Sequence, residues 1–174
     1  HALRNSKRVL IVYGQNAQPT EKQRQNIERF ASKYNWVIVT DFISNLDGSY
    51  NLKPYNMLQS ISQAQFDEQL SPDILITVGG KRLMNDPLTY KVRGGRKDIR
   101  HWSVVPDGRI RDFYFRLSSV IECSQDYFFE FFANNAGDCV NNGEYYSKWK
   151  QMVDHTGAPA ISQFNALHVQ SKFL

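Results

Sequence analysis

Three short runs of consecutive apolar, mostly β-branched residues constrain the fold of this chain more than any other feature. They occupy residues 8–13 (RVLIVY), 36–40 (WVIVT) and 74–78 (ILITV). A strand with one face in water alternates apolar and polar residues, whereas a strand covered on both faces is apolar along its length. The three runs therefore predict central strands of a parallel sheet that is covered by helices on both faces.

The segment between the first two runs carries the pattern of a helix. Thr20 is followed three residues later by Gln23, which is the pairing of a capping box. The apolar residues that follow repeat at helical spacing: Ile27, Phe30, Ala31 and Tyr34. The chain thus opens as strand, helix and strand, and such a crossover between parallel strands is right-handed in nearly all proteins.

The rest of the chain continues this alternation. We expect loops at 41–54 and 93–100, strands at 101–105 and 120–123, and helices near 55–58, from Ser62 onward, within 81–92 with a late start at Pro87, and at 124–133, 145–153 and 162–174. The expected fold is α/β: a Rossmann-like, doubly wound, mainly parallel sheet of five to six strands with helices on both faces. Residues 1–158 would form this domain, and residues 159–174 would be a linker and a helix leading onward.

Length and composition agree with one globular domain and exclude several other classes. The 174 residues are 41% hydrophobic and 22% charged, near the average for such domains. No run of about 18 apolar residues occurs, and the polar, basic N-terminus lacks a secretory apolar segment. Cys123 and Cys139 are too few and too far apart for a zinc ribbon or a redox pair, so we expect free thiols and a cytoplasmic location.

Open α/β sheets bind ligands at the carboxyl ends of their strands, so the loops there are the first candidates for a site. The loop at 13–17 contains only Gly14 and lacks the G-x-G-x-x-G pattern that lets a pyrophosphate approach the backbone. Asp41, after the second strand, could bind a ribose, but without those glycines a loop-capping role is favoured. Both features weigh against an ordinary dinucleotide site.

The loop after the third strand carries the strongest local indication of a ligand. Gly79 and Gly80 allow close approach to the backbone, and Lys81 and Arg82 lie beside a helix start, where an anion is favoured. Together with Asn85 they form the candidate contact set for a substrate or anion. In the competing interpretation, the glycines only relieve crowding at the strand end and the cations are solvated.

A second basic segment follows, made of Lys91, Arg93, Arg96, Lys97 and Arg100. A nucleic-acid patch would be longer and interleaved with aromatic residues, so we do not expect nucleic acid as a partner. A solvated loop is the favoured interpretation, and contact with an anion or with another domain is the alternative. The net charge of +4 permits an anionic ligand without requiring one.

No pattern predicts catalysis or a metal site. His101, His155 and His168 have no companions at metal-ligand spacing, and no P-loop, G-x-S-x-G or H-E-x-x-H motif is present. The aromatic residues of segment 127–132 surround the expected helix, which is typical of a core or of an interface between domains. We therefore assign no catalytic, cofactor-binding or metal-binding residue to this chain.

In their order along the chain, several segments resemble the central domain of thiamine-diphosphate-dependent enzymes, most closely that of the menaquinone-pathway synthase family, which joins 2-oxoglutarate to isochorismate. These segments are KRVLIVYGQN, NWVIVTDFISNL, SPDILITVGGKRL, HWSVVPDGRIRD and DYFFEFFANN. The likeness covers nearly the whole chain. Each motif alone is weak, and their order and spacing carry the resemblance.

The resemblance implies a six-stranded parallel sheet within a larger 2-oxoacid carboligase or decarboxylase. Thiamine diphosphate and magnesium would be held by the N- and C-terminal cofactor domains of the parent, itself a homodimer or homotetramer, and no cofactor is expected in this chain. The family's Ser-Lys-Arg, which faces the substrate carboxylates, aligns with Met84-Asn85-Asp86 here, which leaves the parent's substrate open. A stand-alone nucleotide- or anion-binding module is the alternative function.

Overall fold

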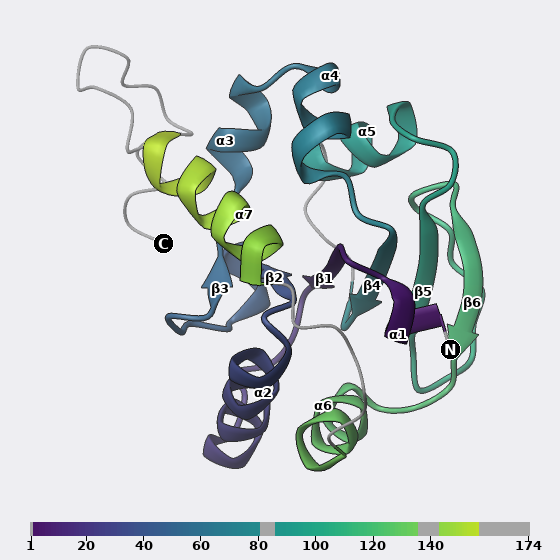
Figure 1. Cartoon of the computed structure of the whole chain (residues 1–174). Coiled ribbons are helices and arrows are strands. Elements are labelled where there is room, and N and C mark those ends of the chain that lie inside the picture. Colours follow the sequence, from purple (N-terminus) through teal and green to yellow (C-terminus); the bar gives the residue numbers. More distant parts are fainter. Residues whose placement is uncertain (1, 81–85, 136–142, 157–174) are drawn as a thin grey trace.

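A single parallel sheet organises the chain, whose computed structural model describes residues 2–80, 86–135 and 143–156 (Figure 1). The strands are β1 (Val9–Tyr13), β2 (Val37–Val39), β3 (Asn51–Leu52), β4 (Ile74–Val78), β5 (Arg100–Val104) and β6 (Leu117–Ile121). Their order in the sheet is β3-β2-β1-β4-β5-β6, and every neighbouring pair is parallel. This order, with its reversal between β1 and β4, is that of doubly wound Rossmann-like folds, so the predicted fold class is confirmed.

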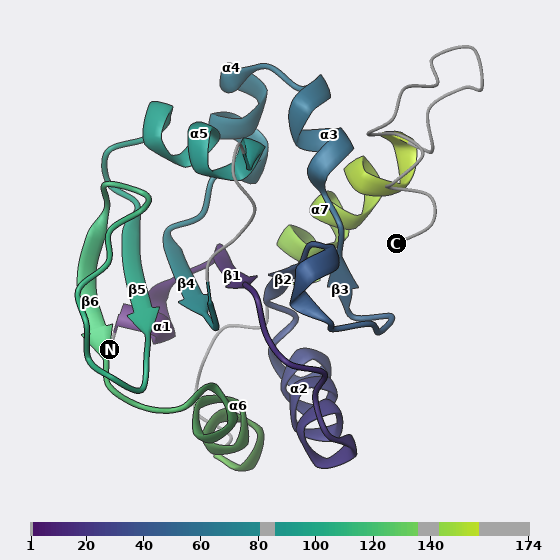
Figure 2. The ribbon, with the colours of Figure 1, turned by 180° about the vertical axis from the view of Figure 1, so that it is seen from behind.

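Helices cover both faces of the sheet, as Figure 1 and the reverse view in Figure 2 show. One face carries α2 (Glu21–Tyr34) and α6 (Gln125–Asn134). The other carries α3 (Tyr55–Ser60), α4 (Gln63–Gln65) with its π-helical continuation η2 (Phe66–Leu70), α5 (Pro87–Gly94) and α7 (Gly143–Thr156). Two short elements, α1 (Ala2–Asn5) and the 3-10 turn η1 (Phe42–Ser44), complete the described structure. Among the described residues, no helix is both long and apolar enough to cross a membrane.

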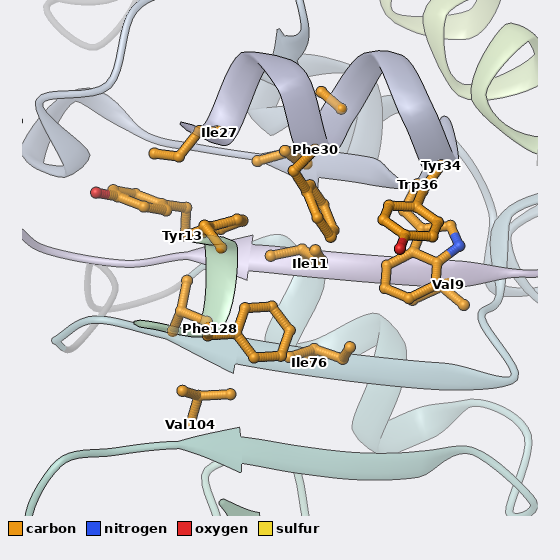
Figure 3. Packing of buried hydrophobic residues seen from close by; sticks show 14 of the residues in the cluster. Val9, Ile11, Tyr13, Ile27, Phe30, Tyr34, Trp36, Ile76, Val104 and Phe128 are labelled. Atoms are coloured by element: carbon orange, nitrogen blue, oxygen red, sulfur yellow. The ribbon is translucent and has the colours of Figure 1, made fainter. Parts of the chain in front are cut away.

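Each central strand divides its side chains between two cores because successive residues point to opposite faces. On β1, Val9, Ile11 and Tyr13 face α2 and α6, whereas Leu10 and Val12 face the α3–α5–α7 side. All five are buried, which explains the uninterrupted apolar run in the sequence. In the first core Phe30 points from α2 toward the sheet (Figure 3). Its ring centroid lies 5.2–6.3 Å from those of Tyr34, Trp36, Phe128, Phe129 and Phe132.

The structure corrects the predicted elements at the two edges of the sheet. The loop expected at 41–54 contains η1 and the two-residue edge strand β3, which is too short to leave an apolar run in the sequence. The strand expected at 120–123 instead spans Leu117–Ile121. The sequence pattern missed its start because Ser118 and Ser119, at the opposite edge of the sheet, are exposed and interrupt the apolar run. The late start of α5 at Pro87 is confirmed. The expected linker and helix at 159–174 lie outside the described residues, as does Cys139.

The capping box before α2 is formed as the sequence predicts. Gln23 N–H donates to Thr20 Oγ1 (3.3 Å), and Thr20 N–H donates to Gln23 Oε1 (2.6 Å). We expect Thr20→Ala to lower the free energy of unfolding by about 1 kcal/mol, because one helix N–H loses its acceptor. Urea unfolding would measure this loss. Thr20→Ser should retain stability, and an unchanged Thr20→Ala variant would contradict the assigned cap.

Candidate functional site

The crevice where such sheets usually bind ligands, at the reversal between β1 and β4, is filled by the chain's own loops. Gly14 N–H donates to the last carbonyl of β4 (2.9 Å), and Gly80 N–H donates to Gln15 O (2.8 Å). A Cβ at Gly14 would collide with the Gly80 carbonyl oxygen, and a Cβ at Gly79 would collide with the Asn16 amide. These glycines thus allow two loops to pack closely, and two of the N–H groups that a pyrophosphate could use are already bonded.

Asp41, at the end of β2, has the capping role that the sequence favoured. Its Oδ1 accepts hydrogen bonds from the Ile43 backbone N–H (3.1 Å) and from Ser44 Oγ (3.0 Å). The Ser44 hydroxyl also lies 2.7 Å from Tyr13 O, which joins the end of β2 to the end of β1. The strand-end loops of β1, β2 and β4 therefore form one hydrogen-bonded unit.

A cavity of about 450 Å³ opens beside this unit. We call it the crossover pocket, because the crossover that joins β5 to β6, residues 105–116, forms one of its walls. The strands contribute Val12, Thr77, His101 and Ser103; α5 and its N-cap contribute Asp86, Thr89, Tyr90 and Arg93; the crossover contributes Val105, Arg111, Phe113 and Tyr114; and the strand-end loops contribute Gly14, Gly79 and Gly80, next to Val78. The volume lies within the usual range for small-molecule sites.

The floor of the crossover pocket is polar although the sheet around it is apolar. Thr77 Oγ1 and His101 Nε2 are hydrogen-bonded at 2.9 Å, and His101 Nδ1 lies 3.7 Å from Asp112 Oδ1. The His101 side chain is 1% exposed, and Tyr114 packs edge-on against it with 5.2 Å between ring centroids. The Asp112 carboxylate accepts from two backbone N–H groups, those of Arg116 and Leu117, each at 3.1 Å. The crossover is thus attached to the sheet through this buried imidazole.

Burial sets the charge states of this pair. It lowers the pKa of His101 to about 4, against the opposing effect of the nearby Asp112 carboxylate. Burial also raises the pKa of Asp112, but the backbone hydrogen bonds from Leu117 and Arg116 outweigh it and the pKa is lowered overall. At neutral pH the pair is therefore a neutral imidazole beside a carboxylate. That carboxylate favours a proton on Nδ1, so Nε2 accepts from the Thr77 hydroxyl.

We expect the stability of this domain to fall on acidification between pH 6.5 and 4. The unfolded chain protonates His101 near its ordinary pKa of 6.5, whereas the folded chain does so only near 4. The unfolded state thus binds more protons in this window, and about 3 kcal/mol is lost across it. Urea unfolding at a series of pH values would measure the slope. His101→Gln should flatten the slope, whereas His155→Gln, at an exposed position, should leave it intact; an unchanged slope in His101→Gln would refute the assignment.

The basic segment is less solvated than the sequence suggested. Lys91 Nζ donates to Ile61 O (2.7 Å), and Arg93 Nε donates to Phe113 O (2.7 Å) while its guanidinium lies 4.3 Å from the Phe115 ring centroid. Arg96 pairs with Asp98, and its Nη2 lies 2.6 Å from Oδ2. Lys97 and Arg100 remain exposed. The segment therefore mainly ties α5 to its neighbours, because backbone carbonyls lie within reach that the sequence could not reveal.

The predicted ligand loop is only partly placed by the structure. Gly79 and Gly80 line the crossover pocket, whereas Lys81, Arg82 and Asn85 lie outside the described residues. The start of α5 already holds a carboxylate: Asp86 Oδ1 accepts from the Leu88 N–H (3.2 Å), and Asp86 Oδ2 accepts from the Thr89 hydroxyl (3.3 Å). An anion at this helix start would therefore meet a negative charge.

Sequence reasoning missed the polar floor, although the sequence contained an indication of it. Thr77, His101 and Ser103 interrupt two apolar strands at positions that point to the same face of the sheet, since Thr77 pairs with Ser103 and His101 with Leu75.

Neither a protein-family model nor a curated protein matches this chain. No group of three or more His, Cys, Asp or Glu side chains gathers in metal-binding geometry within the described ranges.

Proposed function

We propose that this chain is the non-catalytic central domain of a thiamine-diphosphate-dependent 2-oxoacid carboligase or decarboxylase. The sheet is the observation that carries the proposal: six strands, all parallel, are the number and arrangement that the resemblance implies. The hydrogen-bonded loops of β1, β2 and β4 support a structural role, because they join the ends of three strands into one hydrogen-bonded unit.

The proposal places thiamine diphosphate and its magnesium ion outside this chain. The sequence has no Gly-Asp-Gly tripeptide, and the described residues hold no group of three or more His, Cys, Asp or Glu side chains that could bind a metal ion. The proposal therefore assigns the cofactor to the other domains of a homodimeric or homotetrameric parent. Exposed aromatic rings supply candidate contacts with those domains: Tyr127 and Phe131 on α6, and Phe115 on the crossover.

Reading the coding sequence on both sides of this segment tests the proposal most directly. We expect a downstream domain with Gly-Asp-Gly and a spaced Asn, and an upstream domain with a candidate activating Glu. Start and stop codons that bracket these residues would refute it. As a control, thiamine diphosphate with magnesium should leave the melting temperature of the isolated chain unchanged.

A second candidate is a stand-alone nucleotide- or anion-binding module. The crossover pocket favours it, because the cavity lies at the carboxyl ends of β4 and β5, has two arginines, Arg93 and Arg111, and one carboxylate, Asp86, in its wall, and has hydroxyl groups in its floor. Thermal denaturation of the isolated chain with adenine nucleotides and with simple anions would test this function. An unchanged melting temperature with every such ligand would refute it.

A further inference from the structure

We propose that the crossover pocket binds a small organic anion that carries one flat ring. The inference deepens the second candidate function by naming its ligand class, and it holds whether or not the chain belongs to a larger enzyme. Three features of the pocket lead to it: a guanidinium group whose terminal nitrogens have no hydrogen-bond partner among the described residues, two exposed aromatic rings and a buried polar floor.

Arg93 is the group in the pocket wall that is best placed to hold the charge of the ligand. Its Nε donates to Phe113 O and its Cζ lies 4.3 Å from the Phe115 ring centroid, so the guanidinium is held in place. No residue in the described ranges hydrogen-bonds its two terminal nitrogens. The other arginine of the wall, Arg111, pairs with Asp107, with 3.2 Å between Nη2 and Oδ2. A carboxylate or phosphate can therefore take the bidentate geometry that a guanidinium favours at Arg93.

Two aromatic side chains expose ring surface at the pocket. Tyr90, on α5, is 57% exposed, and Phe113, on the crossover, is 44% exposed. Aromatic rings left this open beside a cavity provide apolar surface that a flat ligand ring can cover by offset stacking or edge-to-face contact. A flexible aliphatic anion would gain less from such surfaces, since it has no ring to stack.

The floor supplies the polar end of the site. The Thr77 hydroxyl donates to His101 Nε2, so its oxygen offers lone pairs to a donor on the ligand. Ser103 is 4% exposed, and within the described residues its side chain makes no hydrogen bond, whereas His101 Nδ1 already faces the Asp112 carboxylate. Buried polar groups are usually hydrogen-bonded, so the Ser103 hydroxyl points to a ligand group such as a hydroxyl or a ring nitrogen.

The size and position of the pocket limit the ligand further. The β1–β4 crevice is closed by the Gly14–Gly80 contact, so a dinucleotide cannot lie across it as in an ordinary Rossmann site. A volume of about 450 Å³ suits a single-ring acid or a mononucleotide. Two classes of ligand share this chemistry, aryl carboxylates and nucleoside monophosphates. Titration with one representative of each class distinguishes them.

Isotope-labelled chain of the full 174 residues should be titrated by NMR with 4-hydroxybenzoate and with adenosine 5′-monophosphate. Adenosine supplies a ring without charge, and inorganic phosphate supplies charge without a ring. We expect one of the two ring anions to bind at least about tenfold more tightly than either control, a difference that reflects one added favourable interaction. The backbone signals of Thr77, Thr89 and Ser103 should shift. The ring anion that binds identifies the class.

Two variants locate the binding. Arg93→Gln should weaken it about tenfold or more, as expected for loss of a charge-assisted hydrogen bond. Ser103→Ala removes one floor hydroxyl without touching the bond from Arg93 to Phe113 O, so it tests the site even if Arg93→Gln loosens the crossover. Arg29→Gln, on α2 and on the opposite face of the sheet, is the matched control and should bind normally.

Four results would overturn the inference: no binding of either ring anion at millimolar concentration, shifts confined to another face, equal affinity for inorganic phosphate, or unchanged affinity in both pocket variants. Tight binding of phosphate alone would leave an anion-binding module standing while removing the ring. None of these results bears on the enzyme proposal, which the flanking coding sequence decides.

Discussion

Replacing Phe30 by alanine is expected to lower the free energy of unfolding by about 4 kcal/mol, a value within the range typical of buried phenylalanines. The Phe30 side chain is 0% exposed, and its ring meets aromatic rings from α2, from α6 and from Trp36, the residue before β2 (Figure 3). Truncation leaves a cavity that three separate elements line, so no single shift can close it. Urea unfolding followed by circular dichroism would measure the loss.

The control for Phe30 is an aromatic residue at the edge of the same cluster. Phe131 lies on α6 and is 45% exposed, and its ring contacts Tyr127 and Phe132. We expect Phe131→Ala to cost about 1 kcal/mol or less, because water already covers much of this ring. If Phe30→Ala lowered the free energy of unfolding no more than Phe131→Ala does, the described packing of α2 and α6 around Phe30 would be contradicted.

Gly14→Ala should be the second severe substitution, with a loss of about 3 kcal/mol from overpacking. The added methyl group would collide with the carbonyl oxygen of Gly80, which is backbone and cannot rotate away. The loops after β1 and β4 would have to separate, and the hydrogen bond from Gly80 N–H to Gln15 O would be strained. Chemical denaturation measures the stability, and hydrogen exchange at the Gly80 amide reports the local opening.

Gly94→Ala is the matched control for this glycine. Gly94 ends α5, and the nearest atom to an added Cβ is the flexible side-chain oxygen of Gln63, at 3.4 Å. We expect a change within about 0.5 kcal/mol, or a small gain, because alanine is the better helix former. A Gly14→Ala variant as stable as Gly94→Ala would show that the two strand-end loops do not pack as described.

The candidate site could be predicted only in part. The pair Gly79-Gly80 pointed to the correct end of the sheet, because carboxyl ends of parallel strands gather at one edge. Those glycines proved to serve packing between loops. The polar residues of the pocket floor on β5, His101 and Ser103, lie on a strand that neighbours β4 in space, 20 or more residues away in sequence.

Local patterns in the sequence determined the fold class, because a strand buried on both faces must be apolar throughout and a helix cap needs particular residues at fixed spacing. The runs at 8–13, 36–40 and 74–78 and the Thr20 capping box all formed as those rules require. Tertiary structure alone decided which polar groups meet. The contact between Thr77 and His101, the approach of Asp112 and the anchoring of Arg93 on the crossover depend on strand order and on a 12-residue crossover path, 105–116. Nothing local encodes these, since they arise only when parallel pairing brings β4, β5 and the crossover together.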